Sequence, residues 1–153
     1  MSSTVYQILE EIRNRLATID LDSGFNTDAG ARVYLGKRHP TPDEIDVGPV
    51  LQVYSTDDEP QDPDQFCDPM MIRVSVTVEG FARAIDSDFT LAAHDLIQDV
   101  KSAALIIGSE TLGGLALDFG YSGYSIEYPD SGGDTVMVSL NFSALYEETF
   151  GAP

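Results

Sequence analysis

Two stretches of alternating sequence constrain the fold of this chain more than any other feature. In residues 71–83 (MIRVSVTVEGFAR), apolar side chains alternate with polar ones: Ile72, Val74, Val76 and Val78 against Arg73, Ser75, Thr77 and Glu79. Residues 135–148 (TVMVSLNFSALYEE) place a second apolar set on one face: Val136, Val138, Leu140, Phe142, Ala144 and Tyr146. Because successive side chains of a strand point to opposite faces, both stretches predict half-buried antiparallel strands.

A third stretch, residues 4–18, has the helical period instead. Its apolar side chains recur at helical spacing and form one stripe: Val5, Ile8, Leu9, Ile12 and Leu16. Thr4 and Gln7 fit a capping box at the start of this helix. Arg13 and Arg15 are expected on its solvated side.

A second helix is expected to begin at a cap on Asp86 or Ser87 and to run to about residue 107. Its apolar stripe is Phe89, Ala93, Leu96, Val100 and Ala104. Gly108 is a typical residue just after a helix, and Gly113 and Gly114 allow a turn. This passage therefore returns the chain from a helix on the sheet to the sheet itself.

Three further stretches complete the predicted sheet, at residues 30–37, 50–56 and 115–128, with a bulge or bend at Gly120 and Gly123. Residues 38–49 and 129–134 are rich in Pro, Gly or Asp and are expected to be loops.

The predicted order of elements is α-β-β-β-α-β-β. Short connections favour antiparallel neighbours, with both helices on one face of the sheet. The fold class is therefore α+β: one domain over residues 1–153, with a mainly antiparallel five-stranded sheet, two helices packed on one face, and a short C-terminal tail at 149–153.

Residues 57–69 (DDEPQDPDQFCDP) interrupt this pattern with six acids and three prolines. Such a stretch is expected to be an exposed loop between two strands rather than a regular element. A loop of this length in a small domain is usually functional or disordered. Its acids are the candidate assembly or interface residues: Asp57, Asp58, Glu59, Asp62, Asp64 and Asp68.

The charge of the chain is strongly negative. Twenty-six acids against eight Lys and Arg give −18, and seventeen of the acids are Asp. A nucleic-acid binder needs a basic face to displace counterions from phosphates, so that class is disfavoured. Two explanations fit: the surface faces something negative that must not adhere, or the protein works in high salt, where repulsion between its charges is screened. The Asp-rich, Lys-poor composition resembles that of proteins from salt-loving organisms.

The sequence offers no recognisable catalytic, cofactor or metal site. His94 lies beside Asp95 with Asp99 nearby, and His39 lies in a proline-rich stretch, so neither has ligand spacing. Cys67 sits among carboxylates, which oppose thiolate formation. The glycines match no phosphate-binding motif, and residues 57–68 fail the EF-hand pattern, which leaves only an irregular divalent site. We therefore expect a protein that is not an enzyme and needs no cofactor. No apolar run is long enough to cross a membrane.

Four segments, in order, resemble the tail terminator (tail completion) proteins of long-tailed bacteriophages and related archaeal tailed viruses. They are VYQILEEIRNRLATI, GPVLQVYSTDDE, IRVSVTVEGFAR followed by DLIQDVKSAAL, and LGGLALDFGY followed by TVMVSLNFSALYEE. The resemblance covers nearly the whole chain and rests on the order and spacing of hydrophobic patterns.

The resemblance implies a structural virion protein. Members form a ring, usually of six subunits, that caps the tail tube, ends its polymerisation and offers a joining surface to the head–tail connector protein. DNA passes through the lumen without specific binding. The implied location is the head-proximal end of the virion tail, after assembly in the host cytoplasm, and the implied partners are further copies of the chain, the tail tube protein and the connector.

Two other classes stay open from the sequence. One is another ring of the same machine, either a tail tube protein or a head–tail connector protein. The other is a soluble acidic module that binds calcium through residues 57–68.

Overall fold

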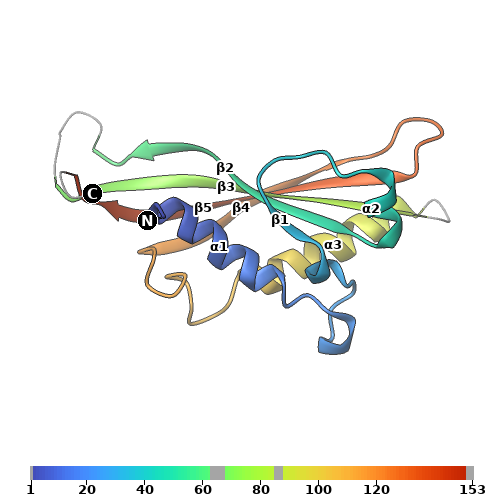
Figure 1. Ribbon diagram of the computed structural model, residues 1–153, viewed down its shortest axis with the longest axis horizontal. Coiled ribbons are helices and arrows are strands. Elements are labelled where there is room, and N and C mark those ends of the chain that lie inside the picture. Colours follow the sequence, from blue (N-terminus) through green and yellow to red (C-terminus); the bar gives the residue numbers. More distant parts are fainter. Residues whose placement is uncertain (1, 63–67, 85–87, 151–153) are drawn as a thin grey trace.

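The computed structural model describes residues 2–62, 68–84 and 88–150. Five strands form one sheet in the order β1-β2-β3-β5-β4. Their bounds are β1 Val33–Leu35, β2 Val50–Pro60, β3 Met70–Arg83, β4 Asp118–Glu127 and β5 Thr135–Glu148. Three α-helices accompany them: α1 Thr4–Leu16, α2 Pro42–Val47 and α3 Phe89–Ala104. The α+β class predicted from the sequence is confirmed, with α1 and α3 lying along the same face of the sheet (Figure 1).

The two alternating stretches form the centre of the sheet, as predicted. β3 and β5 pair antiparallel without a register shift, from Met70 opposite Glu148 to Arg83 opposite Thr135. The apolar members of both strands are buried beneath α1 and α3. Gly80 lets α3 approach closely, because a Cβ there would lie 2.6 Å from Leu96 Cδ2. The core therefore lies between this face and the two long helices.

The first two strands differ from the prediction, because β1 and β2 pair parallel, with Val33 opposite Leu51. Parallel neighbours need a crossover of about a dozen residues or more, and residues 36–49 supply it. Part of that segment, predicted as a loop, is helix α2. Thr41 and Glu44 form a capping box around Pro42 in its first turn.

The crossover also reaches the face of the sheet opposite α1 and α3. Gln52 and Glu79 pair in register, and their side chains point away from the long helices. The backbone N–H of Arg38 donates to Gln52 Oε1 at 3.1 Å, and Arg83 forms an ion pair with Asp46 of α2. The prediction of two helices on one face therefore holds for α1 and α3, whereas α2 packs toward the other face.

Helix α1 differs from the prediction in three respects. Its N-cap is Ser3, whose hydroxyl accepts from the Tyr6 N–H at 3.2 Å, rather than a capping box of Thr4 and Gln7. Arg15 is not on the solvated side, because it is 6% exposed. It lies between α1 and the end of α3, where its guanidinium donates hydrogen bonds to backbone carbonyls. The helix ends at Leu16, two residues earlier than expected.

Helix α3 is capped by Asp88, whose carboxylate accepts from the Leu91 N–H at 3.1 Å. The predicted caps Asp86 and Ser87 lie outside the described residues. The helix ends at Ala104 instead of about residue 107, and β4 begins at Asp118 instead of residue 115. The bulge expected in this strand is confirmed, since the register with β5 shifts between Tyr121 and Gly123.

The prediction of a loop over residues 57–69 is wrong for its first four residues, which belong to β2. β2 continues to Pro60, with Asp58 opposite Val74 and Glu59 opposite Arg73 after a register shift that follows Ser55. The Gln61 N–H extends the ladder by donating to the Met71 carbonyl at 3.0 Å. The local sequence favours an irregular conformation. Pairing with β3 nevertheless stabilises it as a strand.

Candidate assembly surfaces

We call the outer part of β2 and its flanks the acidic arm: Asp57, Asp58, Glu59, Asp62 and Asp68. All five side chains are exposed. They lie at the end of the molecule where β3 and β5 extend beyond α1 and α3 (Figure 1). The sixth predicted interface residue, Asp64, lies outside the described residues, as does Cys67. The structure thus brings five of the six predicted acids together at one end of the sheet.

The arm directs its charges to both faces of the sheet. Asp58 is opposite Val74, whose side chain is buried on the helix-covered face, so Asp58 points to that side. Burial, followed by the nearby carboxylates of Glu148 and Asp58, raises the pKa of Tyr146 to about 12. Burial of the Tyr146 hydroxyl is the larger cause of this raised pKa, and the two carboxylates add to it.

The described part of the C-terminal tail lies against this end of the molecule. The Phe150 N–H donates to Asp68 Oδ1 at 3.2 Å. Residues 151–153, which complete the predicted tail, lie outside the described residues.

Between α3 and β4, three consecutive apolar side chains are exposed. Leu105, Ile106 and Ile107 come directly after α3, and Ile107 is 97% exposed. Large apolar side chains exposed together are typical of protein contact sites. The apolar run ALII at residues 104–107 was predicted as the last turn of the helix, but the helix ends at Ala104 and the next three residues are exposed.

A buried cation holds this passage in place. Arg15 Nη1 donates to the Ala104 carbonyl at 2.9 Å, and its Nη2 donates to the Ser109 carbonyl at 2.7 Å. An arginine at the C-terminus of a helix satisfies carbonyls that have no helical partner and complements the helix dipole. The exposed Leu105–Ile107 segment is thus supported from beneath by α1.

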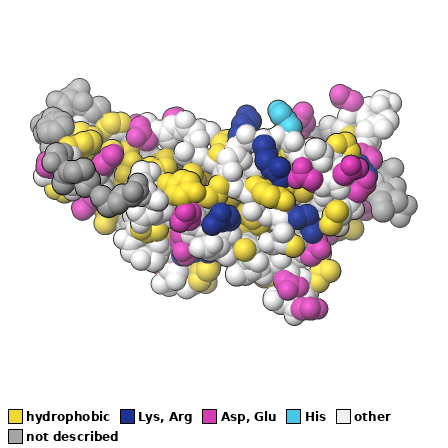
Figure 2. Space-filling view, viewed as in Figure 1, with side chains coloured by type: hydrophobic (Ala, Val, Ile, Leu, Met, Phe, Trp, Pro, Cys, Tyr) yellow, Lys and Arg dark blue, Asp and Glu magenta, His cyan; other side chains and the backbone are white. Residues whose placement is uncertain are grey.

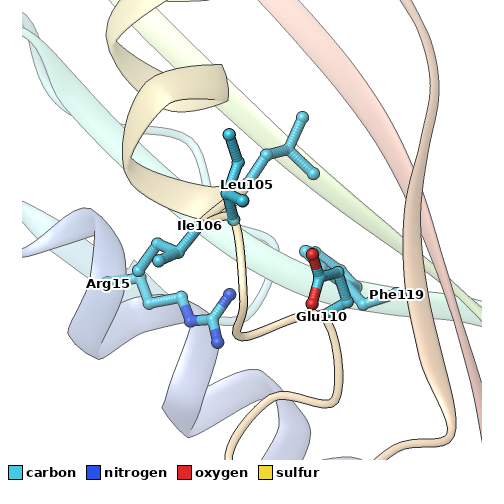
Figure 3. A pocket seen from close by; sticks show the side chains of 6 residues that line it. Arg15, Leu105, Ile106, Glu110 and Phe119 are labelled. Atoms are coloured by element: carbon cyan, nitrogen blue, oxygen red, sulfur yellow. The ribbon is translucent and has the colours of Figure 1, made fainter.

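A small cavity of about 110 Å³ opens beside this support, lined by Arg15, Leu105, Ile106, Ile107, Glu110 and Phe119. Figure 3 shows the Arg15 guanidinium on one side of it and the Glu110 carboxylate on the other. The Gly108 N–H donates to Glu110 Oε1 at 2.9 Å, and this bond is the main reason why the pKa of Glu110 is lowered. The lining is mostly apolar, which suits a side chain of a partner better than a polar substrate.

A second surface is formed where side chains of α3 and of the residue after it lie beside side chains of β4. We call it the tyrosine–lysine surface, and its residues are Leu91, His94, Lys101, Leu105, Tyr121 and Tyr124. Lys101 Nζ lies 4.5 Å from the centre of the Tyr121 ring and 5.5 Å from that of Tyr124. The His94 ring meets Tyr124 edge-on at 5.9 Å. A cation over tyrosine rings is attracted by their electron-rich faces.

Charge is distributed unevenly over the molecule. On the face shown in Figure 2, the few Lys and Arg side chains lie near the middle, while Asp and Glu side chains are spread along the whole length. None of the six residues of the tyrosine–lysine surface carries a carboxylate, although the Asp88 carboxylate borders the surface at Leu91. Lys101 is the charged side chain of this surface that can attract a negatively charged partner.

Asp99 is the most deeply buried acid among the described residues, at 2% exposure. Its two oxygens accept from the backbone N–H groups of Asn26 and Thr27 at 2.9 and 2.8 Å, and from the Thr27 hydroxyl at 2.8 Å. These bonds stabilise a buried charge that would otherwise be costly. Asp99 thus anchors the segment after α1 to α3, a structural role rather than a place in a site with His94.

A second buried acid lies on the opposite face of the sheet. Glu79 accepts from the Tyr54 hydroxyl and from Gln52 Nε2. Burial and the Glu79 carboxylate raise the pKa of Tyr54. The predicted alternation of β3 is therefore confirmed, but Thr77 and Glu79 on its polar side are buried.

The described residues contain no group of three or more His, Cys, Asp and Glu side chains able to hold a metal ion. His39 and His94 are both exposed; His39 lies between β1 and α2, and His94 lies on α3. No helix in the described part of the chain is long and apolar enough to cross a membrane. A scan against protein-family models found no match, and a search of curated protein sequences found none either.

Proposed function

We propose that this chain is the subunit of a homo-oligomeric ring, with six copies, that caps the tail tube of a tailed virus. The ring ends tube polymerisation and presents a joining surface to the head–tail connector. The chain acts as a structural virion protein at the head-proximal end of the tail, assembled in the host cytoplasm, and it is not an enzyme.

The observation that carries this proposal is the difference between the two sides of the sheet. On one side, β1 is three residues long, so among the described strands only β3 pairs with the outer, acidic half of β2 and its other edge is open. On the other side, β4 is ten residues long and bears the tyrosine–lysine surface. Unlike surfaces on opposite sides of a subunit favour head-to-tail contacts, which close into a ring when the rotation between copies permits it.

The exposed Leu105–Ile107 segment gives further support. Its position above a supported turn suits a contact with a neighbouring protein. The net charge of −18 suits a ring through which DNA must slide, because carboxylates toward the lumen repel phosphates.

A virus that lacks this protein tests the proposal. Infected cells are expected to accumulate filled heads beside separate tails, many of them overlong, when examined by electron microscopy. Purified protein added to an extract of such cells should restore joining. Mutant particles that join normally and fail only at adsorption or genome release would refute the assignment.

Two measurements on the protein separate the neighbouring classes. Native mass spectrometry of material from assembled particles should give multiples of six subunits, and a stable dimer or trimer would contradict the ring of six. Electron microscopy of the purified protein should show no long tubes, since self-polymerisation would identify a tube subunit instead. Calorimetry with calcium, with a chelator as control, should show no specific heat of binding; a saturable signal would favour the calcium-binding module.

A further inference from the structure

We infer that the tyrosine–lysine surface of one copy binds the acidic arm of a second copy. The contact pairs this surface on α3 and β4 with the outer half of β2 of the neighbouring copy. It would supply the interface between subunits of the proposed ring, so it rests on the proposed function.

The surface has the chemistry of a protein contact. Leu91 is 57% exposed and Tyr124 is 45% exposed. Leu91, His94 and Lys101 lie at helical spacing on α3, and Leu105 is the residue that follows the helix. Aromatic and apolar side chains around one cation are typical of the centre of an interface. The cavity beside Leu105 continues this surface toward Ile107.

The charge of Lys101 identifies the occupant. Within the described chain, Lys101, like Arg13 and Lys37, takes part in none of the ion pairs, whereas Arg15, Arg32, Arg38, Arg73 and Arg83 each have an acidic partner. Among the described residues, the charge of Lys101 lies instead over two tyrosine rings. A cation left without a counter-charge in so acidic a protein is suited to an acidic partner, and the arm has the highest local density of acids.

The arm cannot satisfy Lys101 within the same molecule. In the sheet order β1-β2-β3-β5-β4, β3 and β5 separate β2 from β4. The two surfaces therefore belong to opposite sides of one subunit, and their union must join two copies. Asp58 and Lys101 both lie on the helix-covered side of the sheet, so a neighbour placed edge to edge in the same orientation brings them to the same face.

Disulfide trapping tests the contact without altering its charges. One chain carries Gln98→Cys, one turn from Lys101 on α3, and the other carries Thr56→Cys, next to Asp57; both residues are exposed. Each chain also carries Cys67→Ser. On mild oxidation at low salt, the mixture should form several times more covalent dimer than a control mixture in which Asn14→Cys, on exposed α1, replaces Gln98→Cys. A yield equal to that of the control overturns the inference.

Charge exchange in the same assay tests the pairing. Lys101→Glu in the Gln98→Cys chain should lower the yield to that of the control, and Asp58→Lys in the Thr56→Cys chain should restore it. Lys37→Glu is the matched control, because Lys37 also lies over a tyrosine ring, at 5.6 Å from the centre of Tyr54. Placed in the Gln98→Cys chain instead of Lys101→Glu, Lys37→Glu should leave the yield of covalent dimer unchanged. Circular dichroism checks that each variant is folded. A yield that ignores Lys101→Glu, or that falls equally with Lys37→Glu, contradicts the inference.

The outcome is distinguishable from failure of the proposed function. Specific trapping together with normal assembly of the mutant virus would keep the contact and remove the tail role. Absence of trapping together with unjoined heads and tails would keep the tail role and remove this contact.

Discussion

The two halves of β2 are parts of one strand and are stabilised in opposite ways. Residues 50–53 are buried, between β1 and β3 and between two layers of side chains. Asp57, Asp58 and Glu59 are exposed, and only β3 pairs with them among the described strands. The first half belongs to the body of the domain and is stabilised by burial of its side chains. The second half is stabilised by its backbone pairing with β3. Substitutions in the body should therefore affect folding, and those in the arm should affect assembly.

The largest effect is expected from Asp99→Ala in the body. The change removes the acceptor for two backbone N–H groups and one hydroxyl. Hydrogen bonds to a charged group contribute about 1.5–3 kcal/mol each and are not additive, so the free energy of unfolding should fall by about 3 kcal/mol. Urea denaturation measures it. Asp95→Ala, on the same helix and less buried, is the control and should change little. Equal losses for the two variants would contradict the anchoring role of Asp99.

Arg15→Met should have the next largest effect. Methionine preserves most of the volume but leaves the Ala104 and Ser109 carbonyls without their donor. Leaving buried acceptors unpaired costs about 1–3 kcal/mol, so we expect a loss of about 2 kcal/mol. Arg13→Met, two residues away, is the matched control and should stay within about 0.5 kcal/mol of the parent. Thermal unfolding of both variants would show whether the buried guanidinium, rather than positive charge on α1, matters.

Gly80→Ala tests the packing of the buried half of β2 directly, because Gly80 is opposite Leu51. A Cβ at position 80 would lie 2.6 Å from Leu96 Cδ2 and 3.0 Å from Leu51 Cδ2. Overpacking of a core typically costs about 1–3 kcal/mol, and we expect about 1–2 kcal/mol here because the contacts are with the ends of side chains rather than with backbone. Gly120→Ala is the control, since a Cβ there meets nothing within 4 Å. A stable Gly80→Ala variant would show that α3 can move away from the sheet.

The smallest effect on folding is expected in the arm. Replacement of Asp57, Asp58, Glu59 and Asp62 by Ser should leave the circular dichroism spectrum unchanged and weaken virion assembly. Removal of four like charges should slightly raise the melting temperature at low salt, and the difference should disappear in molar potassium chloride, where the Debye length is about 3 Å. The parent protein should itself become more stable as salt is added. Collapse of the fold in the Ser variant would mean that the arm is structural.

The central strands could be predicted because burial imposed a pattern on their own residues. Ile72 to Val78 and Val136 to Tyr146 alternate since one face of each strand lies beneath helices. The strand at Asp57–Pro60 could not be found in this way, because its stability comes from pairing with residues 72–74 rather than from its own composition.

Helix α2 and the burial of Arg15 each have a signal in the sequence. The sequence TPDE at residues 41–44 is a capping box with Pro in the first turn, which marks the start of α2, but its prolines suggested a loop. Arg15 lies three residues after Ile12 and seven after Ile8, on the buried stripe, and its charge alone led us to place it in solvent. The tyrosine–lysine surface needed the structure, since Lys101 and Tyr121 belong to different elements.

The pairing of β3 with β5 also sets how the chain must reach its native state. Thr77 and Asn141, which face each other across these strands and share a side-chain hydrogen bond, are 64 residues apart in the sequence. The intervening chain has to lose conformational entropy before the pairing of these strands contributes any stability. Domains dominated by such non-local contacts typically fold in milliseconds to seconds rather than microseconds. During that interval α1 and α3 can form locally, but neither has the completed sheet against which to bury its apolar stripe.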